Sequence, residues 1–345
     1  MDGKKLMLGV AACVLAISLL AGLTRQPLLT ITTQYASIAR MLVPARWLPP
    51  GVWVSIEQPF VTTAVPKPTG KTVSLGASVG GYQEFQFLDK QGRAMNFLMY
   101  VPPSGAPGQK YPLVLVLEGS GEEAQPNMSP SQGLALLAGH PYVTPWVPDP
   151  ANPGAPNVQS NWPSFIVIPQ LTSPSRWVDV PGNQGSYQLA PSPTVGLEMA
   201  KELVDTLQSE YSQIDGNRLY VTGISMGGYG TWEMVERWPG YFAAAVPVAG
   251  GGDPSKAYLL KDLPIWVFQG AADTLVPVSA TGDMVSAIKA AGGNPKYTLL
   301  PGLGHNDTTW TAVYDVTAPS PNNLFQWLFA QHKAGAGNSP VASLE

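Results

Sequence analysis

A serine between two glycines is the clearest candidate for chemistry in this sequence. Residues 223–227 read Gly-Ile-Ser-Met-Gly, after a strand-like run at 218–222 and before a helix-like run at 226–237. In such a strand–turn–helix setting, a sharp turn lifts the serine hydroxyl above the sheet edge, and the small residues let strand and helix approach closely. The alternative is a glycine-rich turn with an incidental serine. Ser225 is a credible nucleophile only if a base and an acid lie at suitable places.

The base should be one of three histidines, because a serine hydroxyl is a weak nucleophile until a base takes its proton. On folds that carry such a serine turn, the chain order is serine, acid, histidine. His140 precedes Ser225, and His332 lies beside a tail of small residues. His305 ends Pro-Gly-Leu-Gly-His, a glycine-rich turn after a strand-like run at 297–300. We therefore predict His305 as the base, with an ordinary loop histidine as the alternative.

The acid is expected on the loop after the preceding strand-like run, residues 265–268. Asp273 is the only acidic residue on that loop, at residues 269–277. Its role would be to hold the tautomer of His305 and to stabilise the imidazolium. The alternative for Asp273 is an Asx-type turn. Asp253 is the second choice, but it precedes the strand that should carry the acid.

Two backbone N–H groups are predicted to stabilise a developing oxyanion. One belongs to Met226, at the start of the helix that follows the nucleophile. The other is expected on the loop after an early buried strand, residues 113–117, which continues as Glu-Gly-Ser-Gly-Glu. We predict the N–H of Ser120, with a flexible strand-end loop as the alternative.

Alternating strand and helix patterns place these residues on one class of fold. Continuous runs of Val, Leu and Ile, as at 111–117 and 165–168, are typical of strands buried on both faces of a parallel sheet. The predicted strands are 84–88, 94–101, 111–117, 165–168, 218–222, 243–248, 265–268 and 297–300, and the predicted helices are 195–211, 226–237, 278–291 and 323–332. The sequence therefore predicts an α/β fold, a mostly parallel central sheet with helices on both faces.

The segment around the serine closely resembles the nucleophile region of a known group. Residues 219–232 read Leu-Tyr-Val-Thr-Gly-Ile-Ser-Met-Gly-Gly-Tyr-Gly-Thr-Trp, and they resemble the exported esterase and "predicted peptidase" branch of the α/β-hydrolases. That branch includes feruloyl-esterase-like and polyhydroxybutyrate-depolymerase-like enzymes. Residues 270–277 and 304–310 are similar to it too, so the resemblance covers about residues 82–332. It implies the α/β-hydrolase fold, ester hydrolysis through an acyl-enzyme, and no cofactor; we predict no metal site.

The resemblance also assigns roles and shows two departures. It implies a nucleophile, an acid, a base and two oxyanion donors at Ser225, Asp273, His305, Ser120 and Met226. Glu118 stands where the family usually has histidine before a glycine, and Gln269 stands where it often has histidine. Neither departure removes a member of the triad. An anion at Glu118 would, however, oppose a nearby oxyanion.

Aromatic residues favour an aromatic or polymeric ester as the substrate. Trp177 and Trp310 lie in segments expected to rim the site, and aromatic walls suit flat or apolar acyl groups. Arg176 would bind a carboxylate or cap a loop. For the tryptophans the alternative is packing in the core. A serine peptidase of prolyl-oligopeptidase-like fold stays open, as does, less favoured, a non-catalytic surface binding protein.

Composition narrows the classes of partner. The net charge is −4, charged residues are 12%, and no basic patch is present, so nucleic acid is not an expected partner. Cys13 is the only cysteine, so the rest of the chain has no disulfide, Cys-ligated zinc or cysteine nucleophile. The expected partner is a small-molecule or polymeric ester.

The N-terminal residues predict export. Lys4 and Lys5 precede an uncharged apolar run at 6–23, a pattern typical of a signal peptide or a membrane anchor, with a buried helix as the alternative. Residues 10–13 also resemble a lipobox, although the apolar run continues beyond Cys13. We predict a leader at 1–25, a Pro/Thr-rich extension at 26–78, a catalytic domain at 79–333 and a flexible tail at 334–345. The catalytic domain is then secreted, periplasmic or anchored outside the cytoplasm.

Overall fold

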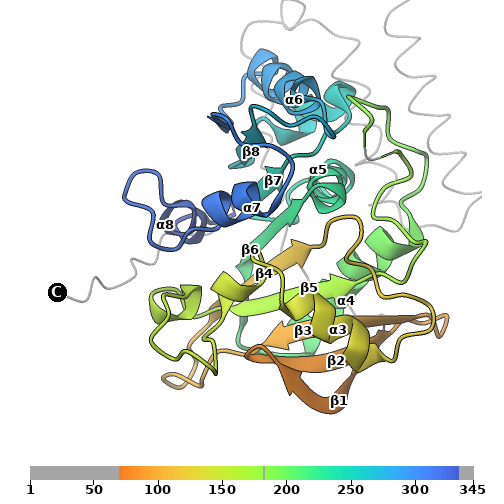
Figure 1. The fold of residues 1–345 in the computed structure, drawn as a ribbon, viewed down its shortest axis with the longest axis vertical. Coiled ribbons are helices and arrows are strands. Elements are labelled where there is room, and N and C mark those ends of the chain that lie inside the picture. The colour runs from red at the N-terminus through yellow and green to blue at the C-terminus, as the bar shows by residue number, and fades with distance from the viewer. Residues whose placement is uncertain (1–69, 182, 334–345) are drawn as a thin grey trace, which may run out of the picture. The chain divides into compact units, whose positions relative to one another are not determined.

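The computed structural model describes residues 70–181 and 183–333. The predicted leader, nearly all of the extension and the C-terminal tail lie outside these residues. Nine strands form one sheet in the order β1-β2-β3-β5-β4-β6-β7-β8-β9 (Figure 1). The strands are β1 Lys71–Val79, β2 Tyr82–Leu88, β3 Ala94–Tyr100, β4 Tyr111–Leu117, β5 Phe165–Gln170, β6 Ile214–Ile224, β7 Ala244–Val248, β8 Trp266–Gly270 and β9 Lys296–Leu300.

The helices follow the strands along the chain. They are α3 Pro130–Ala138, α4 Val195–Glu210, α5 Met226–Arg237, α6 Val278–Ala290, α7 Asp307–Val313 and α8 Leu324–Phe329, with short 3₁₀ turns η2 Thr144–Trp146, η3 Val158–Ser160 and η4 Pro254–Leu260. Among the described residues, none of these helices combines the length and the apolar character needed to cross a membrane.

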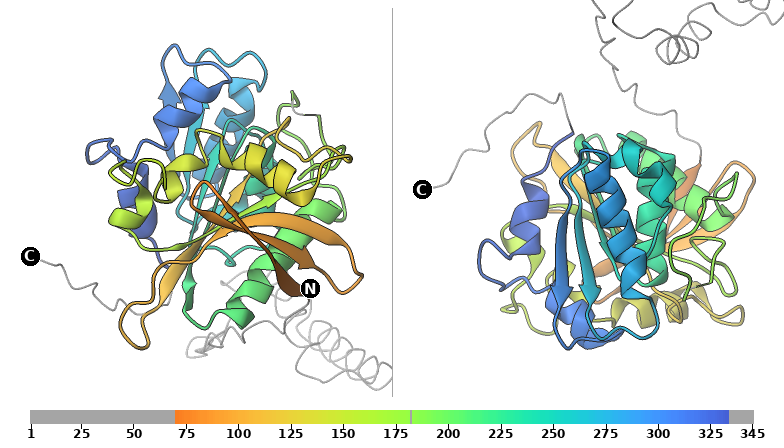
Figure 2. Two further views of the ribbon diagram at one scale, coloured as in Figure 1. Left: turned by 60° about the horizontal axis from the view of Figure 1, so that its bottom comes forward. Right: turned by 90° about the horizontal axis from the view of Figure 1, so that it is seen from above.

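The sheet is parallel from β5 to β9, and β1, β2 and β3 join it in antiparallel fashion. Every residue of β4 and β5 is buried, as their continuous apolar runs predicted. Side chains of β4 alternate between two cores: Leu113, Leu115 and Leu117 pack with α4, α5 and α6, whereas Val114 and Val116 pack with α3, α7 and α8. The helices therefore cover both faces of the sheet (Figure 2), and the predicted fold class is confirmed.

The first strand corrects the predicted domain boundary. The sheet begins at Lys71, inside the predicted extension and before the boundary at residue 79, because β1 pairs with β2. None of the residues of β1 is buried. Its sequence alternates, with Val73, Leu75, Ala77 and Val79 at every second position, which is a strand pattern that the prediction passed over when it assigned the segment to the extension. Leu75 and Val79 are partly buried against the core.

Three helices differ from the prediction. α3 and α7 were not predicted, although α3 has a capping box in which the Ser129 side chain accepts from the Gln132 N–H and the Gln132 side chain bonds back. α8 ends at Phe329 instead of continuing to residue 332. The chain then turns away, and the Lys333 N–H donates to the Asn217 carbonyl oxygen over 3.0 Å.

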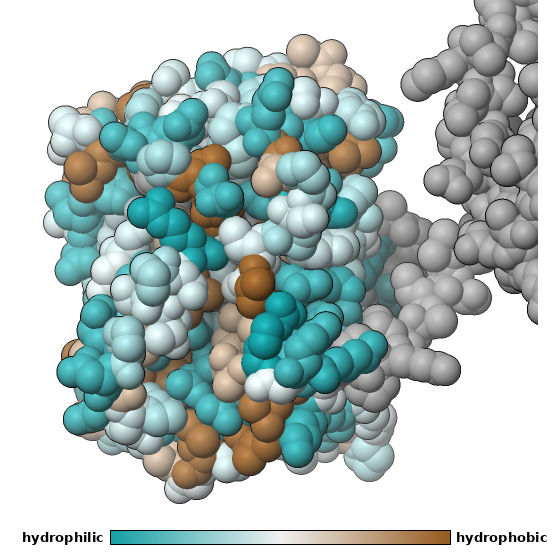
Figure 3. All heavy atoms as spheres, turned by 90° about the vertical axis from the view of Figure 1, so that its right-hand side faces the viewer, coloured by the Kyte–Doolittle hydropathy of each residue, from teal (hydrophilic) through white to brown (hydrophobic). Residues whose placement is uncertain are grey.

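The outer surface has no dominant apolar area on the side shown in Figure 3. Hydrophobic residues there form separate small patches among hydrophilic ones. Scattered exposed apolar side chains are normal on a folded domain.

Glycines at the start of α5 let this helix approach the sheet closely. A Cβ at Gly227 would lie 2.1 Å from the carbonyl oxygen of Leu117, and a Cβ at Gly228 would lie 2.3 Å from that of Val248. No side chain fits at either place. This approach fixes the turn between β6 and α5, where Ser225 lies.

Gly227→Ala should therefore lower the free energy of unfolding by about 1–3 kcal/mol, because the new methyl group forces the Leu117 backbone to move. Gly282 is the matched control, since it lies on α6 and a Cβ there meets nothing within 4 Å. Gly282→Ala should keep or raise the stability, because alanine is the better helix former. Urea unfolding measures both, and equal losses in the two variants would contradict the close contact.

Candidate active site

Ser225 lies at the turn between β6 and α5 in a strained backbone conformation. Its φ is 53° and its ψ is −118°. Residues other than glycine rarely adopt a positive φ, and they do so mostly where the surrounding structure enforces it. The Ser225 N–H donates to the Val248 carbonyl oxygen over 2.9 Å and so ties the turn to β7. The side chain is half-buried at the end of the strand.

The predicted base and acid lie beside this serine. His305 Nε2 is 2.8 Å from Ser225 Oγ, and His305 Nδ1 is 2.8 Å from Asp273 Oδ2. The Asp273 side chain is fully buried, while the His305 side chain is 11% exposed. With the proton on Nδ1 held by the carboxylate, Nε2 presents its lone pair to the hydroxyl. The structure thus brings the three predicted residues together in the order that general-base activation of a serine requires.

Four donors hold the Asp273 carboxylate. Oδ1 accepts from the N–H groups of Leu275 and Val276, both over 2.9 Å, and Oδ2 accepts from His305 and from Gln269 Nε2 at 2.8 Å. Burial alone would raise the pKa of Asp273, but the bonds from His305 and from the two backbone N–H groups lower it below its usual range. The carboxylate therefore stays ionised opposite the imidazole.

Gln269 takes part in this network, although the sequence marked it only as a departure from histidine. It is fully buried, and its Oε1 accepts from the Thr281 hydroxyl over 2.7 Å. That bond fixes the amide so that Nε2 faces Asp273. The opposite orientation would place an amide oxygen against a carboxylate. Gln269 is therefore an extra donor behind the acid.

Trp310 packs against the imidazole instead of forming an open wall. The two ring centroids are 5.0 Å apart and the rings are nearly perpendicular, at 88°. Trp310 is only 5% exposed. It lies on α7, whose first turn is capped by the Asn306 side chain. The residue predicted to bind substrate thus supports the position of His305.

Trp177 and Arg176 lie elsewhere than predicted. Trp177 is fully buried, and its indole N–H donates to the Glu118 carbonyl oxygen over 3.0 Å, as a buried indole requires a partner. This corrects its prediction as a substrate-binding residue. Arg176 is exposed and donates to the Val180 carbonyl oxygen over 3.1 Å, which is the loop-capping alternative. Asp253, the second-choice acid, accepts from the Ser255 N–H and caps η4.

The two predicted oxyanion donors lie on adjacent segments. Leu117 of β4 and Gly223 of β6 are register partners, so the loops after these strands begin side by side. The Met226 N–H opens α5, which has no capping side chain, and Ser120 is exposed after β4. Within residues 70–181 and 183–333, neither N–H donates to a protein acceptor. Both are available to a developing negative charge.

Glu118 is bonded to the segment after β5. Its side chain is fully buried, Oε1 accepts from the Leu171 N–H over 2.7 Å, and Oε2 has no partner among the described residues. Burial raises the pKa of this carboxyl well above its usual range, and the bond from Leu171 offsets only part of the rise. Burial therefore favours the protonated form of Glu118 and weakens the opposition to an oxyanion that the sequence predicted.

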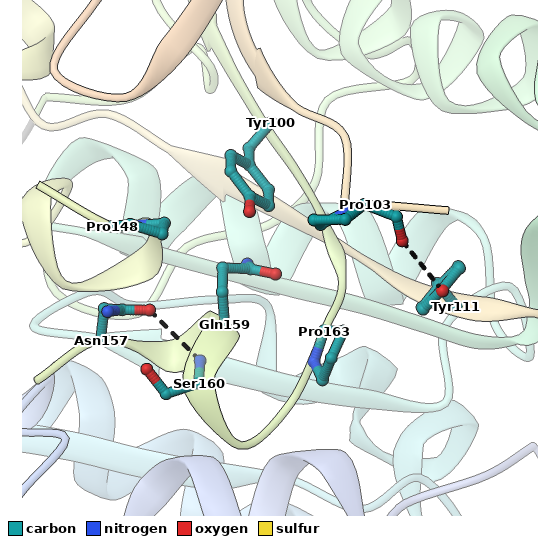
Figure 4. A pocket seen from close by; sticks show the side chains of 8 residues that line it. All are labelled: Tyr100, Pro103, Tyr111, Pro148, Asn157, Gln159, Ser160 and Pro163. Atoms are coloured by element: carbon teal, nitrogen blue, oxygen red, sulfur yellow. Dashed lines mark hydrogen bonds between the residues drawn. The ribbon is translucent and has the colours of Figure 1, made fainter. Parts of the chain in front are cut away.

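A separate pocket of about 310 Å³ lies at the other end of β4, around Tyr111 (Figure 4). It is lined by Tyr100, Pro103, Tyr111, Pro148, Asn157, Gln159, Ser160 and Pro163. Its polar side chains are largely committed within the protein: the Tyr111 hydroxyl donates to the Pro103 carbonyl oxygen, and Gln159 Nε2 donates to that of Trp146. The pocket is not part of the candidate active site, which lies beyond the opposite end of the strand.

Comparisons with known proteins bear on the family and the fold of this chain. The model of a family described as "Putative esterase" matches residues 89–335. A solved structure of a thermostable esterase is 31% identical, with a TM-score of 0.58 over 73% of this chain and 64% of that one. Together with the mostly parallel sheet, this likeness establishes the α/β-hydrolase fold.

Two curated relatives are similar over parts of their length. Poly(3-hydroxyalkanoate) depolymerase C of Paucimonas lemoignei is 45% identical over 51 residues, which are 15% of this chain and 12% of that protein. The protein named "Putative esterase NocK", of Nocardia uniformis subsp. tsuyamanensis, is 24% identical over 208 residues, 59% of this chain and 52% of that protein. The chain therefore spans about half of the second relative and a small part of the first.

The Glu118 environment leads to a prediction about stability. A carboxyl whose pKa is raised by folding stabilises the protein fully only below its unfolded pKa, about 4.3, and that contribution is lost as the pH rises toward the folded value. Gln at this position keeps the acceptor for Leu171 and has no proton to lose. Glu118→Gln should thus become more stable than the wild type as the pH rises, by at most about 1.4 kcal/mol per pH unit.

Urea unfolding of both proteins at about pH 5 and about pH 8 measures this gain. Asp262→Asn removes a carboxyl that is 80% exposed, and it controls for general effects of charge. A difference between Glu118→Gln and wild type that is the same at both pH values would show that this carboxyl is not perturbed.

Proposed function

Since this chain belongs to the family described as "Putative esterase", we propose that it hydrolyses carboxylic esters through a covalent acyl-enzyme. The observation that carries the proposal is the unbroken hydrogen-bonded order of Ser225, His305 and Asp273. This order lies on a strained turn between a strand and a helix. An incidental serine in a glycine-rich turn has no reason to be aligned with a base and a buried carboxylate.

The proposed reaction uses each side chain in turn. His305 Nε2 accepts the Ser225 proton as Oγ attacks the ester carbonyl carbon, and a tetrahedral intermediate forms. The same nitrogen gives the proton to the departing alkoxide, which leaves the acyl group on Ser225. Water, activated by His305, then releases the acid and restores the serine. Asp273 keeps the imidazole in the required tautomer and stabilises its charged form.

Charge on the carbonyl oxygen is stabilised by the N–H groups of Ser120 and Met226 in this proposal. The positive end of the α5 dipole lies at the same place, since Met226 opens that helix. The protonated form of Glu118, which burial favours, does not oppose the oxyanion. Removing one donor of this kind typically lowers the rate by about 10²- to 10³-fold.

We further propose an aromatic or polymeric ester as the substrate class. The likeness of a 51-residue segment to a poly(3-hydroxyalkanoate) depolymerase supports a polymeric ester. Leu275, 59% exposed on the loop that carries Asp273, offers an apolar contact beside the triad. The buried Trp177 no longer supports an aromatic wall.

Export is proposed from the sequence alone. The lysine pair and the apolar run at 6–23 support a signal peptide or a membrane anchor. Either would place the catalytic domain outside the cytoplasm, where a polymeric ester can reach it.

Ser225→Ala should lower ester turnover by about 10⁴-fold or more, because no other group supplies the nucleophile. Initial rates of both proteins on p-nitrophenyl esters of increasing acyl length, on aryl esters and on peptide p-nitroanilides measure this. Peptide turnover far above ester turnover would favour the serine peptidase. The absence of any Ser225-dependent turnover would favour a non-catalytic binding protein.

Gln269→Leu should lower kcat by about 10-fold with little change in KM, because the charged acceptor Asp273 loses a buried donor. Gln269→His restores a donor and should recover most of the activity. A kcat of Gln269→Leu equal to that of the wild type, or a Gln269→His variant no more active than Gln269→Leu, would refute this role.

A further inference from the structure

We propose that Glu122 is a positioning residue for the oxyanion loop, residues 119–121, and that it leaves the Ser120 N–H as the one N–H this loop presents. The inference rests on the proposed function and extends it, because it names the group that orders the second oxyanion donor. Glu122 was not singled out by the sequence, where it is one of three glutamates in residues 118–123.

The three N–H groups of this loop have different partners. Glu122 Oε2 accepts from the Gly119 N–H over 2.9 Å, and Glu123 Oε2 accepts from the Gly121 N–H over 2.7 Å. Among the described residues, the Ser120 N–H between them donates to no protein acceptor. Carboxyl groups thus accept from the N–H groups of Gly119 and Gly121, and the Ser120 N–H between them is left available to substrate.

Glu122 is the better anchored of the two acids. Its side chain is 10% exposed, and Oε2 also accepts from the hydroxyl of Tyr142, which is fully buried. Burial raises the pKa of Tyr142 well above its usual range, so this phenol keeps the proton that it donates. His140 Nδ1 lies 3.9 Å from Oε1. The segment after α3 therefore fixes the same carboxyl oxygen to which the Gly119 N–H donates.

The loop is held at both ends: its N-terminal end continues from β4, which ends at Leu117, and its C-terminal side is tied to β5 and to the segment that follows β5. Gln170 Nε2 donates to the carbonyl oxygens of Glu122 and Gly133, both over 2.9 Å. The Ala124 N–H donates to the Leu171 carbonyl oxygen over 2.9 Å. With both ends fixed, the Glu122 carboxyl is the buried group that reaches back to a backbone N–H inside the loop.

The charge on Glu122 is not what this role requires. Burial raises its pKa above the usual range, although the bonds from Tyr142 and Gly119 partly offset the rise. A carboxyl oxygen accepts hydrogen bonds in either protonation state. Position, not charge, is therefore the expected contribution, and an amide of the same shape should supply it.

Four variants of the full chain test this, with p-nitrophenyl ester kinetics and thermal unfolding measured on each. Glu122→Ala should lower kcat about 10- to 100-fold and leave KM within about 2-fold, since the donor acts mainly in the transition state. Glu122→Gln should stay within about 3-fold of wild type, because its amide oxygen can accept from Gly119 and Tyr142. Tyr142→Phe, which keeps the ring, should lower kcat a few-fold.

Glu84→Ala is the matched control. Glu84 is a buried acid on β2 that accepts from the Ser131 hydroxyl of α3 and does not touch the loop. Its loss should lower the melting temperature and leave kcat unchanged.

The outcomes separate this inference from the proposed function. Wild-type kcat in Glu122→Ala, or a loss as large in Glu122→Gln as in Glu122→Ala, would overturn the positioning role while ester hydrolysis stands. A kcat loss in Glu84→Ala equal to that in Glu122→Ala would also overturn it. If Glu122→Ala does not fold, an unchanged kcat in Tyr142→Phe overturns it. A wild type without Ser225-dependent turnover would overturn both proposals.

Discussion

The approach of α5 to the sheet is the constraint on which the site depends. Gly227 lies so close to the Leu117 carbonyl oxygen that no Cβ fits between them. That contact holds the start of α5 against the end of β4, and the pairing of β4 with β6 brings the loop of Ser120 beside the helix start at Met226. Because this contact joins two backbone segments, no change of side-chain rotamer can alter the distance between α5 and β4.

Buried acids around the site are kept in different states by their surroundings. Asp273 receives four hydrogen bonds and stays ionised, which suits a partner for an imidazolium. Glu118 is buried with one oxygen unpaired among the described residues, and its neutral form is favoured. Both carboxyl groups are buried, so the number of hydrogen bonds that each one accepts, more than its burial, decides which of them carries a negative charge.

The sequence predicted the features that depend on local pattern. Ser225, Asp273 and His305 could be found because each follows a predicted strand and because the chain order is restrictive. Contacts between distant segments carry no such pattern. The sequence around Trp177 fits a residue at the rim of the site as well as one in the core. Only the hydrogen bond from its indole N–H to the Glu118 carbonyl oxygen distinguishes the two. The bond from Tyr142 to Glu122 joins segments whose packing no periodicity reveals.

The backbone conformation of Ser225 has a consequence for how this protein can change over time. A positive φ costs a serine about 1–3 kcal/mol, whereas glycine adopts it nearly freely. Selection for thermal robustness alone would therefore favour the loss of the hydroxyl at this turn. A serine at this position lowers the stability of the domain, so other interactions in the domain must offset the cost of its backbone strain.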